Sequence, residues 1–195
     1  MGLSWVFRGG ETPLDPDEIE GLRVPLITTR AELDEHEQLN IQRANAWLLE
    51  RRPPTGDLLT DTFVKRLHRE MFGEVWQWAG AFRRTEKNLG VDPLRIATDL
   101  RQLLDDVRFW VEHDTHPPDE IAIRAKHRMV SIHCFVNGNG RHARLFADVL
   151  AQALGRPPFT WGTSIPDREV RQHYLEVLRQ ADRGDLSFLL AFSRT

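Results

Sequence analysis

The chain has 195 residues, of which 41% are hydrophobic, 28% charged and 9% aromatic, a composition typical of one globular domain. Its 26 basic and 29 acidic residues give a net charge of −3, which argues against a strongly basic nucleic-acid binder, so we expect no direct nucleic-acid partner. No apolar run reaches the roughly 18–20 residues of a membrane span, and residues 1–10 lack the pattern of a secretory signal. We therefore expect a cytoplasmic protein that does not enter a membrane, and its only cysteine, Cys134, excludes an intrachain disulfide.

Residues 1–27 are expected to form a loop or a short helix, because glycines and prolines recur there. Within this stretch, Pro16 suits the first position of a helical turn. Thr28 or Thr29 then caps a long helix, and Glu32 completes a capping box with Thr29. That helix is predicted to run to about residue 51, where two prolines stop it.

Apolar periodicity predicts a second helix over residues 57–72 and a third over residues 94–113. An aromatic corner around Trp76 and Trp78 follows the second helix. Residues 82–93 have little periodicity and contain turn residues, so a short hairpin or a loop is expected there.

Further helices are expected in the C-terminal half of the chain. Asp119 is predicted to cap a buried helix that ends near Ile132, and the next helix covers about residues 141–154. Two last helices cover about residues 167–182 and 186–192. Because helices predominate and at most one hairpin is expected, the sequence predicts an all-α fold.

The residues with chemical potential lie in segment 133–144. His133 ends the buried helix, and a turn with two glycines, Gly138 and Gly140, leads into the next one. The free N–H groups and positive dipole end of that next helix form an anion-binding site. The glycines let a ligand approach the backbone closely.

Two arginines, Arg141 and Arg144, lie three residues apart on one face of the new helix, an arrangement suited to a polyphosphate. An unperturbed histidine titrates near neutral pH, so we expect His133 to be a general base. The side chains of Asn137 and Asn139 offer carbonyl oxygens to a metal ion and N–H groups to phosphate oxygens. Each feature alone also fits a plain helix restart or a core histidine, but the combination favours a phosphate site.

The neighbouring thiol of Cys134 suggests a cysteine nucleophile as an alternative. Adjacent residues on a helix point about 100° apart, so Cys134 and His133 are not expected to form a dyad. The other histidines show no spacing typical of a zinc site.

The segment from His133 to Arg144 resembles the motif of the Fic (Fic/DOC) family, His-x-Phe-x-(Asp/Glu)-Gly-Asn-Gly-Arg-x-x-Arg, at every fixed position except Asn137. Residues 78–83 are similar to the family segment that precedes its target-binding flap, and residues 174–185 are similar to its C-terminal helix. Residues 12–22 and 28–41 resemble a bacterial subgroup, the mobile mystery protein B proteins.

The resemblance implies one Fic domain over residues 1–195, with a helical core over residues 28–195 and a short β-hairpin flap. It also implies transfer of AMP from ATP to a Ser, Thr or Tyr hydroxyl of a protein target. His133 would take the hydroxyl proton, and Arg141 and Arg144 would hold the β- and γ-phosphates. The implied catalytic residues are His133, Asn139 and Arg141, and the implied nucleotide-binding residues are Gly138, Asn139, Gly140, Arg141 and Arg144.

Asn137 stands where the family has the carboxylate expected to hold Mg²⁺. An amide keeps an oxygen but loses the charge, so binding of Mg²⁺, or of Mn²⁺ in its place, should weaken. The alternatives are a weakened AMP transferase, a degenerate Fic domain that binds nucleotide or a partner protein with little catalysis, and an enzyme that transfers another nucleotide or phosphate-containing group. The complete Gly-Asn-Gly turn argues against the Doc-like branch, which transfers phosphate.

The resemblance places Asn88 and Leu89 in the flap, where the target backbone would pair with them. It also makes Glu20 a candidate inhibitory residue acting through Arg144, although Pro16 occupies the Ser/Thr position of that pattern. The subgroup implies an antitoxin-like helix-turn-helix partner and a toxin–antitoxin setting.

Overall fold

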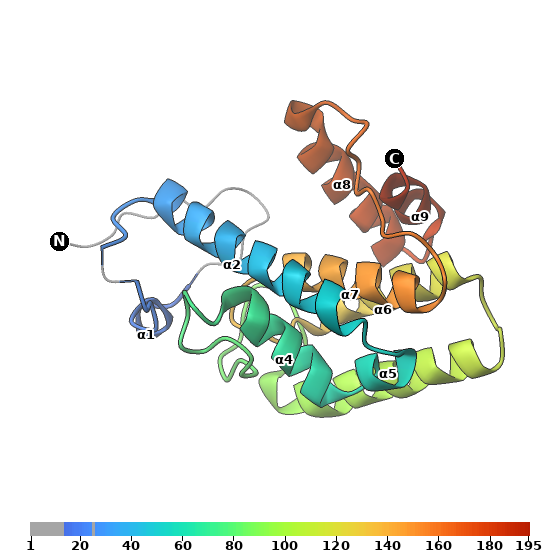
Figure 1. Cartoon of the computed structure of the whole chain (residues 1–195), viewed down its shortest axis with the longest axis horizontal. Helices are drawn as coiled ribbons and strands as arrows, with labels where there is room; N and C mark the ends of the chain where they lie inside the picture. The colour runs from blue at the N-terminus through green and yellow to red at the C-terminus, as the bar shows by residue number, and fades with distance from the viewer. Residues whose placement is uncertain (1–13, 25) are drawn as a thin grey trace.

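Helix α2 (Arg30–Arg51) begins at the predicted capping box in the computed structural model of the chain (Figure 1). The Thr29 hydroxyl accepts the Glu32 N–H at 3.3 Å, and the Glu32 carboxylate accepts the Thr29 N–H at 3.0 Å. Because these bonds satisfy donors that a helix start leaves open, the box fixes where α2 begins. The structure describes residues 14–24 and 26–195. The breakers and the part of the subgroup resemblance that fall in residues 1–13 or at residue 25 lie outside the described residues.

The single helix expected over residues 57–72 is instead two helices, α3 (Thr55–Leu58) and α4 (Asp61–Phe72). Thr60 separates them: its backbone is extended, and its hydroxyl accepts the Phe63 N–H at 3.1 Å. A threonine in this conformation acts as an N-cap and starts a new helix. Apolar periodicity continues across the break, so the pattern alone did not reveal it.

Helices α5 (Ile96–Glu112) and α6 (Pro118–Ile132) lie near their predicted bounds. The prediction that Asp119 caps α6 is wrong, because Pro117 holds the cap position. The Asp119 carboxylate lies in the first turn and accepts a hydrogen bond from Arg194 at 2.8 Å. It therefore ties the start of α6 to the C-terminal end of the chain.

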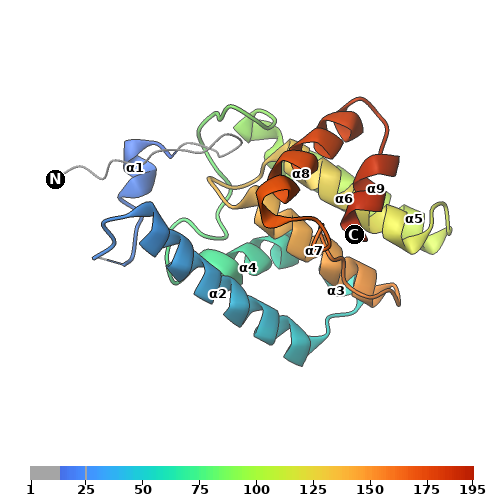
Figure 2. The ribbon, with the colours of Figure 1, turned by 90° about the horizontal axis from the view of Figure 1, so that it is seen from above.

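The remaining helices are α7 (Asn139–Ala153), α8 (Asp167–Asp182) and α9 (Ser187–Ser193). Figures 1 and 2 show α6 and α7 side by side through the middle of the molecule. Helices α2 and α4 pack together and α4 contacts α7, while α5 lies along α6 and α9 packs on α6. This arrangement confirms the all-α prediction and places the α6–α7 turn at one end of the bundle.

The hairpin expected over residues 82–93 does not form in this structure. The segment runs as a loop, and its backbone bonds to the α6–α7 turn rather than to itself. The Arg83 N–H donates to the Cys134 carbonyl at 3.0 Å, and the Val91 N–H donates to the Ile132 carbonyl at 3.3 Å. A 3₁₀ turn then leads into α5. We call residues 82–91 the flap loop.

A short helix, α1 (Pro16–Ile19), forms where the sequence predicts it, with Pro16 at its first position. Beyond α1, Leu22 makes an isolated antiparallel bridge with Trp76, which docks the N-terminal segment on the aromatic corner. None of the helices in the described ranges combines the length and the apolar character that crossing a membrane requires.

Three histidines lie in the interior: His68 on α4, His133 at the end of α6 and His142 on α7. Burial disfavours the imidazolium, so the pKa of His68 falls well below 6.5 and the pKa values of His133 and His142 fall to about 4. Burial also raises the pKa of Asp148, on α7, to about 6. These groups titrate differently in the folded and unfolded chain.

The free energy of unfolding is therefore expected to fall as the pH drops from about 6.5 toward 4. In that window the unfolded chain protonates these three histidines while the folded chain leaves them neutral, at up to about 1.4 kcal/mol per pH unit for each. Asp148 offsets part of this loss of stability. Its pKa is raised in the folded chain, so the folded chain takes up that proton at a higher pH than the unfolded chain does. Urea unfolding at pH 7 and pH 5 checks this, and an unchanged free energy of unfolding would contradict the burial of the imidazoles.

Candidate active site

The turn between α6 and α7 depends on two residues with left-handed backbone. His133 ends α6 with φ of 55°, and Gly138 begins α7 with φ of 77°. A Cβ at Gly138 would lie 2.7 Å from the Phe72 ring, so both conformation and space require glycine there. At Gly140, by contrast, a Cβ would meet no atom within 4 Å. Space is therefore open beside Gly140, in the first turn of α7.

Asn139 closes the turn from inside. Its side-chain oxygen accepts the Phe135 N–H at 2.9 Å, and its amide nitrogen donates to the Phe135 carbonyl at 2.8 Å. Both residues are buried. The Asn139 side chain therefore holds the shape of the turn, while its backbone N–H lies at the half-buried start of α7.

His68 holds the same turn from the outside, a role that the sequence analysis missed. Its Nδ1 accepts the Gly80 N–H at 3.0 Å, so its Nε2 carries the proton and donates to the Asn137 carbonyl at 3.0 Å. Its ring also stacks on Phe135, with centroids 3.8 Å apart. The sequence contained one usable signal, a histidine on the apolar face of a predicted helix.

His133 lies directly under the flap loop and is 5% exposed. A Cβ at Gly90 would lie 2.6 Å from the His133 Cβ, which shows how closely the two segments pack. Burial, and next the nearby Arg83 guanidinium, lower the pKa of His133 to about 4. The imidazole is therefore neutral at physiological pH, the state in which it accepts a proton.

Arg83 joins the flap loop to the turn. Its guanidinium donates to the His133 carbonyl at 2.7 Å and to the Thr85 carbonyl at 2.9 Å, and it also bonds to the Val91 carbonyl. The predicted flap residues Asn88 and Leu89 lie between these anchors and are exposed. The two ends of the loop are thus fixed, and its tip is open to a partner.

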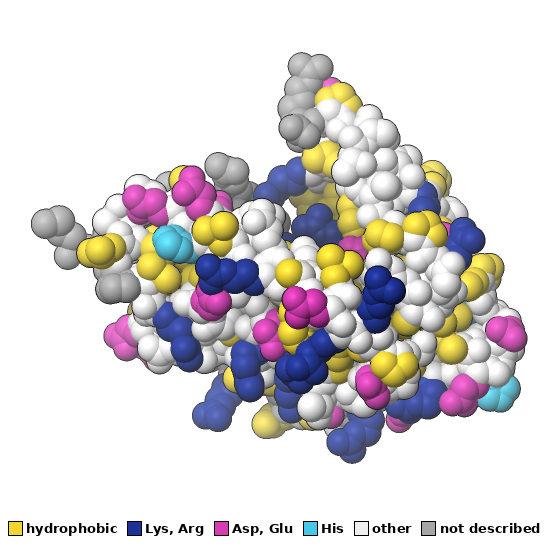
Figure 3. All heavy atoms as spheres, in the orientation of Figure 1, with side chains coloured by type: hydrophobic (Ala, Val, Ile, Leu, Met, Phe, Trp, Pro, Cys, Tyr) yellow, Lys and Arg dark blue, Asp and Glu magenta, His cyan; other side chains and the backbone are white. Residues whose placement is uncertain are grey.

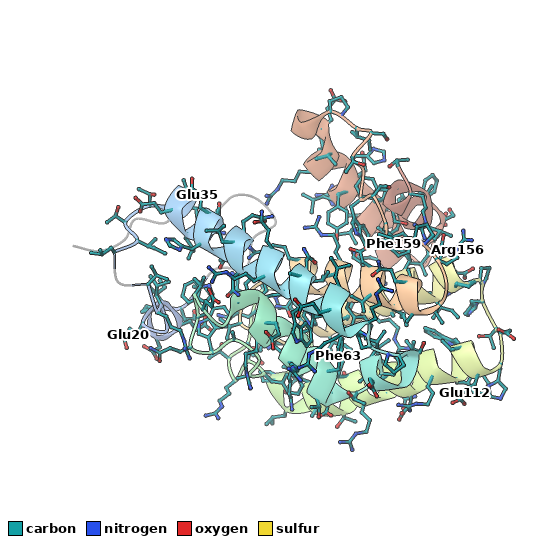
Figure 4. The ribbon with its side chains drawn as sticks, in the orientation of Figure 1. Glu20, Glu35, Phe63, Glu112, Arg156 and Phe159 are labelled. Carbon is teal, nitrogen blue, oxygen red and sulfur yellow. The ribbon has the colours of Figure 1, made fainter. Side chains whose placement is uncertain are left out.

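The α1 segment is joined to the flap loop by ion pairs with Lys87. The Lys87 ammonium, whose side chain is 4% exposed, donates to Asp15 at 2.8 Å and to Glu18 at 2.5 Å. Glu18 also accepts from the Thr85 hydroxyl at 3.1 Å. Glu20, the candidate inhibitory residue, is instead exposed at the end of α1, and Figure 4 shows it well away from α7. The α1 carboxylate that reaches the site is Glu18, and it contacts the flap loop.

The two arginines of α7 have different surroundings. Arg141 stacks over the Phe72 ring at 4.8 Å and donates to Glu37 at 2.5 Å. Arg144 lies half-buried over the Tyr174 ring at 5.5 Å. Arg144 makes no ion pair with the carboxylates that the structure describes. In Figure 3, Lys and Arg side chains, dark blue, gather in the hollow between α2 and α8.

The candidate magnesium ligand in the turn, Asn137, is a neutral amide rather than a carboxylate. The Asn137 side-chain oxygen already accepts the Gly138 N–H at 2.6 Å. No group of three or more His, Cys, Asp or Glu side chains in residues 14–24 and 26–195 is arranged to hold a metal. The Cys134 thiol is also unsuited to nucleophilic chemistry, because burial raises its pKa to about 12.

A half-buried helix start beside a neutral imidazole, on an all-helical scaffold, is the kind of arrangement in which proteins bind phosphate groups at a helix N-terminus. The family model of the Fic/DOC family matches residues 58–151, which include α4 to α7 up to Ala151 and the whole turn. Residues 58–151 therefore match a Fic/DOC family domain.

Curated relatives support this assignment. Proteins named protein adenylyltransferase Fic from Drosophila grimshawi and Drosophila virilis are 30% and 31% identical to the chain, over alignments that cover 89% of it. The chain spans 38% of the length of these relatives.

Solved structures confirm the fold. Fic-1 from C. elegans superposes with a TM-score of 0.65 at 25% identity, over 90% of this chain and 56% of that one. BepC from Bartonella tribocorum, solved with bound AMPPNP, superposes with a TM-score of 0.66 at 18% identity, over 86% of this chain and 87% of that one. A Fic domain from Bartonella quintana with bound ADP gives 0.66 at 17% identity, over 87% and 86% of the two chains.

Replacing His68 with Phe should destabilise the protein by about 2–4 kcal/mol, because Gly80 N–H and the Asn137 carbonyl both lose their partner while the ring volume is kept. Urea unfolding measures the loss. The matched control is His113→Phe, since His113 is exposed on the surface, and it should be close to neutral. A free energy of unfolding for His68→Phe within about 0.5 kcal/mol of the parent would show that the two bonds do not hold the turn.

Proposed function

We propose that this chain is a protein adenylyltransferase, which transfers AMP from ATP to a Ser, Thr or Tyr hydroxyl of a target protein. The observation that carries the proposal is the position of His133, a neutral imidazole between the open start of α7 and the flap loop. The relatives named protein adenylyltransferase, and the Bartonella domains with AMPPNP and ADP, support a nucleotide as the ligand of this turn.

The proposed reaction has two coupled events at the site, proton transfer to His133 and displacement of pyrophosphate from ATP. The His133 imidazole accepts the proton of the target hydroxyl, and the oxygen attacks the α-phosphorus of ATP. The bond from that phosphorus to the oxygen bridging to the β-phosphate breaks, and pyrophosphate leaves with the electron pair. Phosphates beside His133 would raise its pKa from about 4, so the base strengthens when the nucleotide is in place.

The start of α7 and its arginines would hold the phosphates. The N–H groups of Asn139 and Gly140 and the helix dipole would offset the charge that develops in the transition state. Arg144, which has no carboxylate partner among the described side chains, is available for the terminal phosphate. Arg141 is partly exposed and faces the same side of α7, where it would bind the preceding phosphate.

Asn137 favours a second candidate, a degenerate Fic domain that binds nucleotide with little catalysis. The amide carries no charge, and its oxygen already bonds to Gly138, so a divalent cation that arrives with ATP would gain little from the protein. Transfer of another nucleotide or phosphate-containing group is a third candidate. The assignment to the mobile mystery protein B subgroup, and the antitoxin-like helix-turn-helix partner it implies, stay predictions.

Labelled ATP separates these candidates. With α-labelled ATP and a cell extract as the source of targets, we expect label on protein, and with γ-labelled ATP none. His133→Ala should reduce labelling by roughly 10²–10⁴-fold because the base is lost, while ATP affinity measured by calorimetry changes little. Arg144→Ala should do the opposite and weaken ATP binding. Labelling from the γ position only would contradict the proposal, and ATP binding without any labelling would establish the degenerate domain.

The substitution Asn137→Asp tests how much the absence of a carboxylate at this position weakens the binding of ATP with Mg²⁺. The substitution should tighten binding of ATP in the presence of Mg²⁺ and weaken binding of metal-free ATP. Its new charge is a hard ligand for the cation but repels bare phosphates. Titration calorimetry with and without Mg²⁺ measures both effects. Asn45→Asp, on the exposed face of α2, is the control for added charge alone, and equal behaviour of the two variants would show that residue 137 does not face the metal.

A further inference from the structure

Glu37 is a buried carboxylate with no part in the function proposed above. It lies on α2, is 3% exposed, and both of its oxygens are engaged. One accepts the Trp76 indole N–H at 2.6 Å, and the other accepts from Arg141 at 2.5 Å. A carboxylate this deeply buried needs such partners, because an unpaired charge in the interior is strongly unfavourable.

Arg141 is held from two directions. Glu37 binds one of its terminal nitrogens, and the Phe72 ring lies under its guanidinium at 4.8 Å. The same Phe72 ring backs Gly138, at the start of the anion-binding turn. One nitrogen and one face of the guanidinium are thus occupied, and the Arg141 side chain is still 31% exposed, so its other N–H groups are accessible to a ligand. A planar guanidinium fixed in this way presents its remaining N–H groups in one orientation.

We propose that Glu37 is a positioning residue that holds Arg141 ready for a phosphate group of the nucleotide, an inference that rests on the proposed function. Glu37 cannot act as a gate that swings aside, because Trp76 fixes its second oxygen inside the protein. Trp76 in turn stacks on Trp78, with centroids 4.9 Å apart. The aromatic corner thus sets the position of Glu37, and Glu37 sets the position of Arg141.

The substitution Glu37→Gln should change the affinity for ATP in opposite directions, depending on whether Glu37 acts only through its charge or by positioning Arg141. Removing a negative charge near the site should tighten anion binding by Coulomb attraction. Loss of positioning should weaken it, and we expect roughly tenfold weaker binding of ATP. Glu35→Gln makes the same charge change on the exposed face of α2, where Figure 4 shows Glu35 pointing outward, and it should leave the affinity within about twofold of the parent.

A double-mutant cycle completes the test. Calorimetric affinities for ATP and for inorganic tripolyphosphate are measured for Glu37→Gln, Arg141→Ala and the pair. We expect Glu37→Gln to have no further effect once Arg141 is Ala, because a positioning residue acts only through the group it positions. Equal losses in both backgrounds, or tighter binding by Glu37→Gln alone, would overturn the proposal.

Trp76→Phe supplies a second variant if Glu37→Gln folds poorly. It removes the indole N–H that fixes Glu37, keeps an aromatic ring, and should weaken ATP binding in the parent but not in Arg141→Ala. Loss in both backgrounds would again count against positioning. These titrations do not follow AMP transfer, so a chain that binds ATP with this coupling but labels no protein would refute the proposed function and leave the role of Glu37 intact.

Discussion

The α6–α7 turn depends on side-chain hydrogen bonds, and the buried imidazole of His68 joins it to α4 and to the segment at Gly80. That ring connects the Asn137 carbonyl to the Gly80 N–H and lies flat against Phe135. A neutral imidazole suits this task because one nitrogen accepts while the other donates. Without it, a carbonyl and an N–H from two distant segments would be buried without partners.

The residues of the candidate site depend on this turn but come from several parts of the chain. His133 and Gly138 begin and end it, the flap loop covers it through Arg83, and α2 reaches it through Glu37. Each contact involves a buried or half-buried polar group whose bonds would be costly to break. The geometry of the site therefore depends on the whole bundle, although the motif that indicates the site is one short segment.

The features that the sequence predicted correctly are those set by interactions between residues close together in the chain. The Thr29 capping box, the proline start of α1 and the glycine turn before α7 each follow from side chains within a few residues of one another. The break at Thr60 was missed because a cap inside a continuous apolar stripe leaves the periodicity unchanged. Asp119 was misassigned because its partner, Arg194, lies 75 residues away.

The same limit applied to the site. The motif makes His133, Arg141 and Arg144 candidate site residues, because their spacing is local, and these roles stay predictions. The contacts of His68 and Glu37 span 69 and 104 residues, and no pattern in a single sequence reports such pairs. The expected hairpin failed for a related reason, since the backbone of the flap loop finds its partners on the α6–α7 turn instead of on itself.

The ion pairs between Lys87 and the α1 segment affect the free energy with which a polypeptide could bind the flap loop. A surface loop of this length ordinarily loses conformational entropy when it becomes ordered against a ligand. Here the ion pairs with Asp15 and Glu18 at one point, and the Arg83 bonds at both ends, order the loop in the free protein. If an extended segment docked along Asn88 and Leu89, it would lose mainly its own conformational freedom, because the loop is already ordered.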